Sequence, residues 1–149
     1  MSWLDGITDE AKTAIMATSD SNGCPHVRWV SPAILSHCPD SIFMVTSPDF
    51  PKSHHISANP KVEWMFQSKS LDKIVNVQGT VTLHNDPALC SEVLEAIGPR
   101  LRTFWHVNPD RHALVVLETA IDKAVCFLPQ KGLKEEVPFR EEEDDGKST

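Results

Sequence analysis

The sequence has no apolar stretch that approaches the roughly 20 residues of a membrane-spanning helix. Residues 1–5 also lack the basic region and following apolar run that a secretory signal would show. We therefore expect a cytoplasmic protein with no membrane partner.

Paired cysteines are missing as well. The four cysteines stand singly, without a CxxC pair, so their spacing predicts neither a zinc site nor a disulfide framework. We expect no metal, and reduced thiols at Cys24, Cys38, Cys90 and Cys126.

Basic clusters and glycine-rich phosphate motifs are absent too. The formal net charge is −7, and residues 134–149 hold seven acids against three bases. No Lys/Arg cluster offers the basic face that binding to nucleic acid requires, so we expect no such partner. Neither GxGxxG nor GxxxxGK followed by Ser or Thr occurs. A phosphate ligand would therefore have to be held by side chains and a helix end.

The 149 residues that are present suit one globular domain. We place this domain at residues 1–133. Residues 134–149 read as an acidic and flexible tail, because a charged segment with few apolar residues buries little surface.

Seven stretches predict β-strands, either by alternation or as short apolar runs. Most are joined by short connections, which favours an antiparallel barrel with short crossing helices over an alternating βαβ fold. Pro32 cannot donate to a sheet ladder, so it should mark a bulge or an edge in its strand. The predicted strands are Thr13–Ser19, His26–Leu35, Ile42–Val45, Val62–Phe66, Lys73–Leu83, Leu114–Leu117 and Ala124–Leu128.

Helical signals lie between these strands. Asp86-Pro87 should open a helix over Ala88–Ile97, and Gly98 should end it. A weaker helical pattern covers Trp3–Lys12, and residues 100–109 are irregular.

The stretch from Thr46 to Pro60 carries the signals of a short helix after a strand. Pro51 suits the first helical position, and Asn59-Pro60 supplies the stop. Lys52 then falls in the first turn, where a cation opposes the helix macrodipole unless an anion, most simply phosphate, binds there. The alternative is a solvated lysine at a helix end.

Histidines flank this candidate site. His54 and His55 are adjacent and therefore lie on different helix faces, which predicts one exposed and one half-buried imidazole rather than a shared metal. His26 lies two residues from Arg28 and should share its strand face. Arg28 itself could be an ordinary exposed strand residue whose stem packs over a neighbour.

Three segments together resemble a known family. They are PHVRWVSPAIL, IFMVTSPDFPKSHHISANPKVEWMF and VNVQGTV. They are similar to the flavin-binding split-barrel family that contains pyridoxamine 5′-phosphate oxidase, and the general-stress-protein branch looks closest. The resemblance implies a mainly β fold, a six-stranded antiparallel split barrel with peripheral helices. It also implies a homodimer that binds one FMN in each of two clefts between subunits.

The resemblance also implies cofactor-binding residues. Arg28 and Lys52 would hold the phosphate, while Thr46 and Ser47 match a strand end that contacts the ribityl-phosphate or the ring. Pro51 stands where many relatives carry a basic residue, and Ile74 replaces a glutamine that contacts flavin in the oxidase itself. The candidate cofactor-binding residues are Arg28, Trp29, Val30, Ser31, Thr46, Ser47, Lys52, Ser53 and Trp105.

Three functions remain open at this stage. The first is an FMN-dependent oxidoreductase that acts on an unidentified small molecule. The second is a flavin- or pyridoxal-phosphate-binding stress protein without turnover. The third is a split-barrel relative that binds haem or another cofactor through a histidine, or that binds nothing and acts by dimerisation. For the dimer, Trp64, Phe66 and Trp105 are candidates to be covered by the partner. Trp64 and Trp105 are core or dimer-interface aromatics in preference to flavin-stacking groups.

Overall fold

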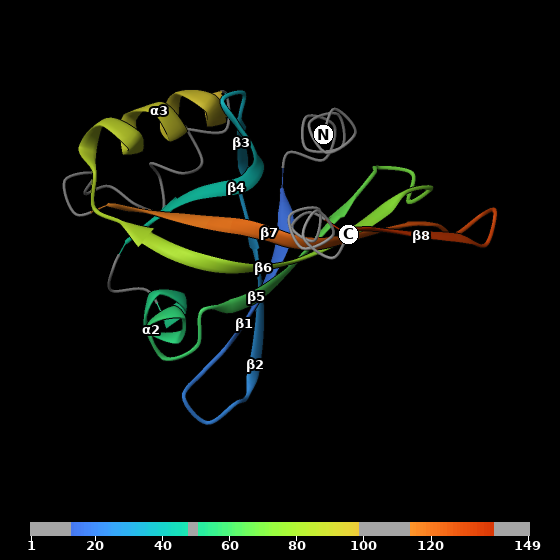
Figure 1. Ribbon diagram of the computed structural model, residues 1–149, viewed down its shortest axis with the longest axis horizontal. Helices are drawn as coiled ribbons and strands as arrows, with labels where there is room; N and C mark the ends of the chain where they lie inside the picture. The colour runs from blue at the N-terminus through green and yellow to red at the C-terminus, as the bar shows by residue number, and fades with distance from the viewer. Residues whose placement is uncertain (1–12, 48–50, 99–113, 139–149) are drawn as a thin grey trace, which may run out of the picture.

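The computed structural model describes residues 13–47, 51–98 and 114–138 (Figure 1). Its elements are β1 (Ala14–Ser19), β2 (Pro25–Val30), β3 (Ala33–Leu35), β4 (Cys38–Thr46), α2 (Pro51–Ala58), β5 (Lys61–Gln67), β6 (Ile74–His84), α3 (Pro87–Ile97), β7 (Val115–Leu128) and β8 (Leu133–Pro138). The predicted helix Trp3–Lys12, the irregular stretch at 100–109 and Trp105 lie outside the described residues.

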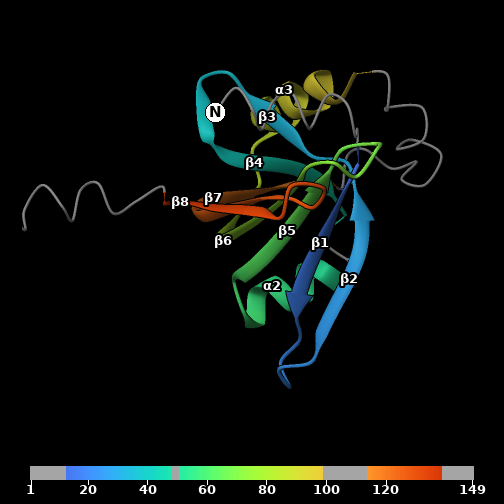
Figure 2. The same cartoon turned by 90° about the vertical axis from the view of Figure 1, so that its right-hand side faces the viewer.

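The strands form one antiparallel sheet that curls around itself (Figure 2). Its order is β2-β1-β5-β6-β7-β4-β3, with β8 added to β7. The first and last strands of this path, β2 and β3, are consecutive in the chain and are separated only by Ser31 and Pro32. The predicted interruption at Pro32 is confirmed, and one bent stretch of chain joins the two ends of the sheet. The fold is the mainly β split barrel that the sequence predicts.

The concave side of the curled sheet holds the larger apolar core. Alternating side chains of the strands point into it, and Ile56 of α2 closes one end. Trp64 and Phe66 belong to this core and are fully buried. The expectation that a partner subunit covers them is therefore wrong, because strand alternation points both rings inward. The core comprises Ala14, Met16, Ile42, Met44, Ile56, Val62, Trp64, Phe66, Val75, Val77, Val81, Leu117, Ile121 and Ala124.

The opposite side of β3, β4 and β7 is covered by α3, as Figure 1 shows. A second apolar core lies between them, formed by Ala33, Leu35, Phe43, Val45, Val93, Ile97, Leu114 and Val116. Strand β4 thus buries alternate side chains in two different cores, which is why its apolar run is continuous rather than alternating.

The two strands predicted at the C-terminal side are one continuous strand, β7. Its register with β6 shifts where Gln78 faces Lys123 and Gly79 faces Ile121, so Asp122 is the extra residue of a bulge. Gly79 makes this approach possible, since a Cβ there would lie 2.5 Å from the backbone oxygen of Ala120. The polar residues between the two predicted strands therefore mark a bulge within β7 and not the end of one strand and the start of another.

Residues 134–138, which the sequence places in the tail, form most of β8. This strand pairs with β7 from Lys123 to Leu128, so it belongs to the sheet. The sequence rule failed because an edge strand needs backbone partners more than it needs apolar side chains.

Among the described helices, none is long and apolar enough to cross a membrane.

Candidate functional site

Arg28 places a half-buried positive charge between β2 and α2. Its Nη1 donates a hydrogen bond to the backbone oxygen of Met16 at 3.2 Å. No acidic side chain of the described residues forms an ion pair with it. Burial lowers the pKa of the Arg28 guanidinium, because the charged form has lost part of its hydration. A bound anion would compensate this charge.

Two histidines stack beside Arg28, one from each element. The ring centroids of His26 on β2 and His55 on α2 are 4.4 Å apart, with the ring planes tilted by 33°. His26 Nε2 lies 3.0 Å from a carboxylate oxygen of Asp20, and His55 Nδ1 lies 2.9 Å from the hydroxyl of Thr18. These contacts tie α2 to the hairpin of β1 and β2. They also confirm that His26 shares a face with Arg28, and that one of the adjacent histidines, His55, is half-buried while His54 is exposed.

The neighbourhood of His55 is rich in positive charge. Burial is the first cause that lowers the pKa of His55, and the charges of His26 and Arg28 lower it further. Asp20 acts in the opposite direction, but more weakly. Neutral imidazole is therefore favoured while no anion is bound.

Thr46 ends β4 with a buried and unsatisfied hydroxyl. The residue is 2% exposed, and its Oγ1 is the one buried side-chain polar atom in the described residues without a hydrogen-bond partner. Other buried hydroxyl groups of the sheet are satisfied; Thr18 bonds to His55, and Thr119 accepts the indole N–H of Trp64 at 3.1 Å. Leaving such a group unpaired costs about 1–3 kcal/mol. A ligand that bonds to Thr46 would remove this penalty.

Helix α2 begins at Pro51 and ends at Ala58, before Asn59-Pro60, as the sequence predicts. Positions 52 and 53 therefore lie in its first turn, and the structure describes only their backbone. Ser47 is half-buried and takes part in an interaction of its own. Helix α2 lies at the end of the sheet opposite α3 (Figure 2). Thr46 ends the strand that precedes this helix, and Arg28 lies on β2, whose hairpin α2 contacts through His55.

The segment 29–31 presents different groups to the two sides of β2. Trp29 is 61% exposed and Val27 is 69% exposed on the outer face. Val30 points the other way and packs against the barrel core, while Ser31 is half-buried before Pro32. The side chains of consecutive residues in this segment therefore point to opposite faces of β2, and no single face carries all three of them. The remaining candidate, Trp105, lies outside the described residues.

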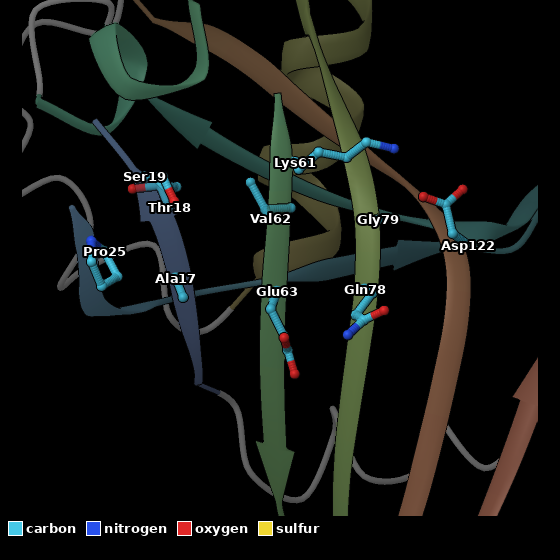
Figure 3. A pocket seen from close by; sticks show the side chains of 10 residues that line it. All are labelled: Ala17, Thr18, Ser19, Pro25, Lys61, Val62, Glu63, Gln78, Gly79 and Asp122. Carbon is cyan, nitrogen blue, oxygen red and sulfur yellow. The ribbon is translucent and has the colours of Figure 1, made fainter. Parts of the chain in front are cut away.

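An open groove of about 380 Å³ crosses the outer face of the sheet near the same hairpin (Figure 3). Polar side chains of β5, β6 and β7 line it, and Thr80 links two of them by accepting from Lys61 Nζ at 3.3 Å and donating to Asp122 at 3.2 Å. Sequence reasoning missed this groove because most of its polar lining residues are outward positions on several different strands. The lining is Ala17, Thr18, Ser19, Pro25, Lys61, Val62, Glu63, Gln78, Gly79 and Asp122.

Within the described part of the chain, no group of three His, Cys, Asp or Glu side chains is arranged to hold a metal ion. The sequence predicted that one of His54 and His55 would be half-buried, without indicating which. The pairing of His55 with His26 could not be read from the sequence, because the two residues are 29 positions apart and β3 and β4 lie between them.

Several solved structures share the fold. General Stress Protein 26 from Bacillus anthracis has a TM-score of 0.68 at 19% identity, over 93% of this chain and 100% of that one. An FMN-binding protein related to pyridoxamine 5′-phosphate oxidase, from Nostoc punctiforme, has a TM-score of 0.67 at 13% identity, over 93% and 96%. HutZ, the haem storage protein of Vibrio cholerae, has a TM-score of 0.65 at 16% identity, over 85% and 92%.

No curated protein matches the sequence. The family model described as pyridoxamine 5′-phosphate oxidase, however, matches residues 4–124, which include both sides of the candidate site. These residues span most of the chain and contain the three segments whose resemblance was noted above. The chain belongs to the pyridoxamine 5′-phosphate oxidase-like family of split-barrel proteins.

Proposed function

We propose that the protein binds FMN at the end of the barrel formed by β2, β4 and α2, and that it is an oxidoreductase acting on a small molecule. The observation that carries the proposal is the buried hydroxyl of Thr46, which lacks a partner in the described residues at the strand end where the resemblance expects the flavin. A native structure rarely leaves such an atom unpaired without a ligand or water to satisfy it.

Arg28 supports the same ligand independently of Thr46. Its charge is half-buried and unpaired by any described acid, which suits a phosphate group. Lys52 in the first turn of α2 would supply a second cation, and the free N–H groups of that turn would add hydrogen-bond donors.

Each of these residues has a role that follows from its chemistry. Arg28 and Lys52 would bind the phosphate, Thr46 would hydrogen-bond to the cofactor, and the backbone of residues 29–31 would orient the ring. Bound FMN would supply the electron-transfer chemistry, for which the protein contributes binding, orientation and exclusion of water.

The proposal includes a homodimer whose subunits share the cofactor sites. Val27 and Trp29 expose a large apolar area on the edge strand β2, and their neighbours on the same face are Ile15 and Ala17 of β1. An apolar face on an edge strand is typical of an interface. Light scattering should give twice the chain mass of 16.6 kDa, and Val27→Glu should shift the protein toward the monomer. A monodisperse wild-type monomer that binds flavin at full strength would contradict the shared site.

Two alternatives are separated by direct measurements. The first alternative is that the protein binds haem, and it is suggested by the structural likeness to the haem storage protein. Absorbance of the purified protein, with mass spectrometry of the released ligand, should identify FMN; a haem spectrum, or the absence of any ligand and of FMN binding, would overturn the proposal. Oxidation of NAD(P)H by the FMN-loaded protein then separates an oxidoreductase from a flavin carrier.

A further inference from the structure

We propose that His55 determines the specificity of the flavin site for a phosphorylated ligand, by taking up a proton when the phosphate binds. This inference rests on the proposed FMN site and adds a residue that the resemblance does not name. It is carried by the contacts that fix the His55 ring beside Arg28 and His26.

The first step concerns position. The hydroxyl of Thr18 lies 2.9 Å from Nδ1 of His55, and the tilted ring of His26 lies with its centroid 4.4 Å away, so two contacts orient the imidazole. Its Nε2 has no hydrogen-bond partner among the described side chains. Position 52 lies three residues earlier in α2, and residues three apart are neighbours on a helix surface. A phosphate bound at the start of α2 would therefore lie within electrostatic range of His55.

The second step concerns charge. The charged and titratable groups that act on His55 come from β2, from the β1–β2 turn and from α2 itself: Arg28, His26, Asp20 and His54. Asp20 is the one acid among them, and it is already engaged. One of its oxygens contacts His26, and the other accepts the N–H groups of Asn22 and Cys24 at 2.9 and 3.0 Å. A bound phosphate would supply the negative charge that the cluster lacks.

The third step gives the sign of the pH dependence. The pKa of His55 is lowered in the ligand-free protein by burial and by its basic neighbours. An anion nearby favours the charged form and raises that pKa. FMN affinity is then fully enhanced below the lowered pKa, where His55 is already charged, and the enhancement is lost as the pH rises through the pKa of the complex. A rise of one unit corresponds to about a tenfold change in affinity.

The phosphate group itself titrates in the same range, with a second pKa near 6, and favours binding at higher pH as it becomes a dianion. The effect of His55 must therefore be measured as a difference between proteins. His55→Asn keeps an amide that can reach Thr18 but cannot be protonated. His54→Asn is the matched control, because it makes the same change at the adjacent exposed position.

The experiment measures dissociation constants of FMN and riboflavin from pH 5.5 to 8.0 for wild type and both variants. The FMN-to-riboflavin preference of wild type should exceed that of His55→Asn by about tenfold at the acidic end and approach it at pH 8.0. His54→Asn should follow wild type. In NMR titrations of the wild-type protein, FMN should raise the pKa of His55 by about one unit, and riboflavin should not.

Each outcome has a clear reading. If FMN binds in preference to riboflavin but His55→Asn keeps the wild-type pH profile, the inference is wrong and the proposed function stands. If His55→Asn weakens the binding of FMN and of riboflavin equally, and FMN does not change the pKa of His55 in wild type, His55 has only a structural role and the inference is wrong. If neither flavin binds wild type, the proposed function and this inference fall together.

Discussion

The two described helices lie at opposite ends of the sheet and differ in how they are held (Figures 1 and 2). Asp86 caps α3 by accepting the N–H groups of Ala88 and Leu89, and Pro87 occupies its first turn. On its apolar face, Val93 and Ile97 are buried, and Leu89 and Leu94 are partly buried beside them. The capped start of α3 and its buried side chains therefore follow rules that stabilise a helix.

Helix α2 follows few of these rules. It is eight residues long, and Ile56 is the one described side chain that it buries. Polar contacts of His55 hold it against β1 and β2 in place of an apolar stripe. The comparison indicates that α3 serves stability and that α2, with the unpaired groups around it, serves a ligand. Mutations at the two ends should therefore separate unfolding from flavin binding.

The largest effect is expected at the α3 end. Ile97→Ala should lower the free energy of unfolding by about 2–5 kcal/mol, because the side chain is 1% exposed and its removal leaves a cavity under the helix. Urea denaturation measures the change. Glu95→Ala, at an exposed position of the same helix, should change stability by less than about 0.5 kcal/mol. Folded Ile97→Ala should bind FMN like wild type; a large loss of binding would show that the two ends are coupled.

Lys52→Ala should produce the opposite pattern at the α2 end. A hydrogen bond to a charged group contributes about 1.5–3 kcal/mol, so FMN affinity should fall by roughly 10- to 150-fold. Stability should hold or rise slightly, because the variant removes a cation from a helix N-terminus. Isothermal titration with FMN and riboflavin provides the measurement, and riboflavin, without a phosphate, should bind both proteins alike. If wild type and Lys52→Ala bind FMN with equal affinity, Lys52 is a solvated helix residue and does not bind the phosphate.

The same comparison explains what could be predicted from the sequence. Helix α3 and strand β6 were placed within one or two residues, because capping residues and strict alternation are local signals. The interruption at Pro32 could also be predicted, because it depends only on the proline at that position. The split barrel itself came from the order of three motifs, which no periodicity could have supplied.

Predictions failed where the answer depended on distant residues. The sequence left Trp64 open as a core or a dimer-interface aromatic, and the structure places it in the core, where its N–H donates to Thr119 on β7. The bulge at Asp122 was interpreted as a gap between two separate strands. The sequence near Asp122 does not reveal the bulge, because it depends on the close approach of Gly79 on β6. For the site, Arg28 and Thr46 were named in advance, but the burial of their polar groups was not. The assembly around His55 needed three-dimensional contacts from β1 and β2.

Thr46→Val should sharpen the comparison by moving stability and binding in opposite directions. Removing a buried hydroxyl that has no described partner should raise the free energy of unfolding by about 1 kcal/mol, since the shape is kept. The loss of a neutral hydrogen bond of about 0.5–1.5 kcal/mol should weaken FMN by roughly 2- to 12-fold. Thermal unfolding without ligand and FMN titration measure the two effects.

Thr119→Val is the control for Thr46. It is the same substitution in the same core, but it leaves the indole N–H of Trp64 without its acceptor, so stability should fall. If Thr46→Val were destabilising to the same degree, its hydroxyl would have a structural role and the case for a ligand there would be lost.

The smallest effect is expected from the cap of α3. Asp86→Ala removes the acceptor of the Ala88 and Leu89 N–H groups, at 3.0 and 3.4 Å, and should cost about 1 kcal/mol of unfolding free energy. Asp86→Asn, which keeps a side-chain oxygen at the cap, should recover most of this loss. FMN affinity should stay within about twofold of wild type in both variants, because a change of 0.4 kcal/mol or less is expected so far from the site. A tenfold loss of FMN binding in Asp86→Ala, restored in Asp86→Asn, would mean that the order of α3 controls the flavin site, and the separation of the two ends would have to be abandoned.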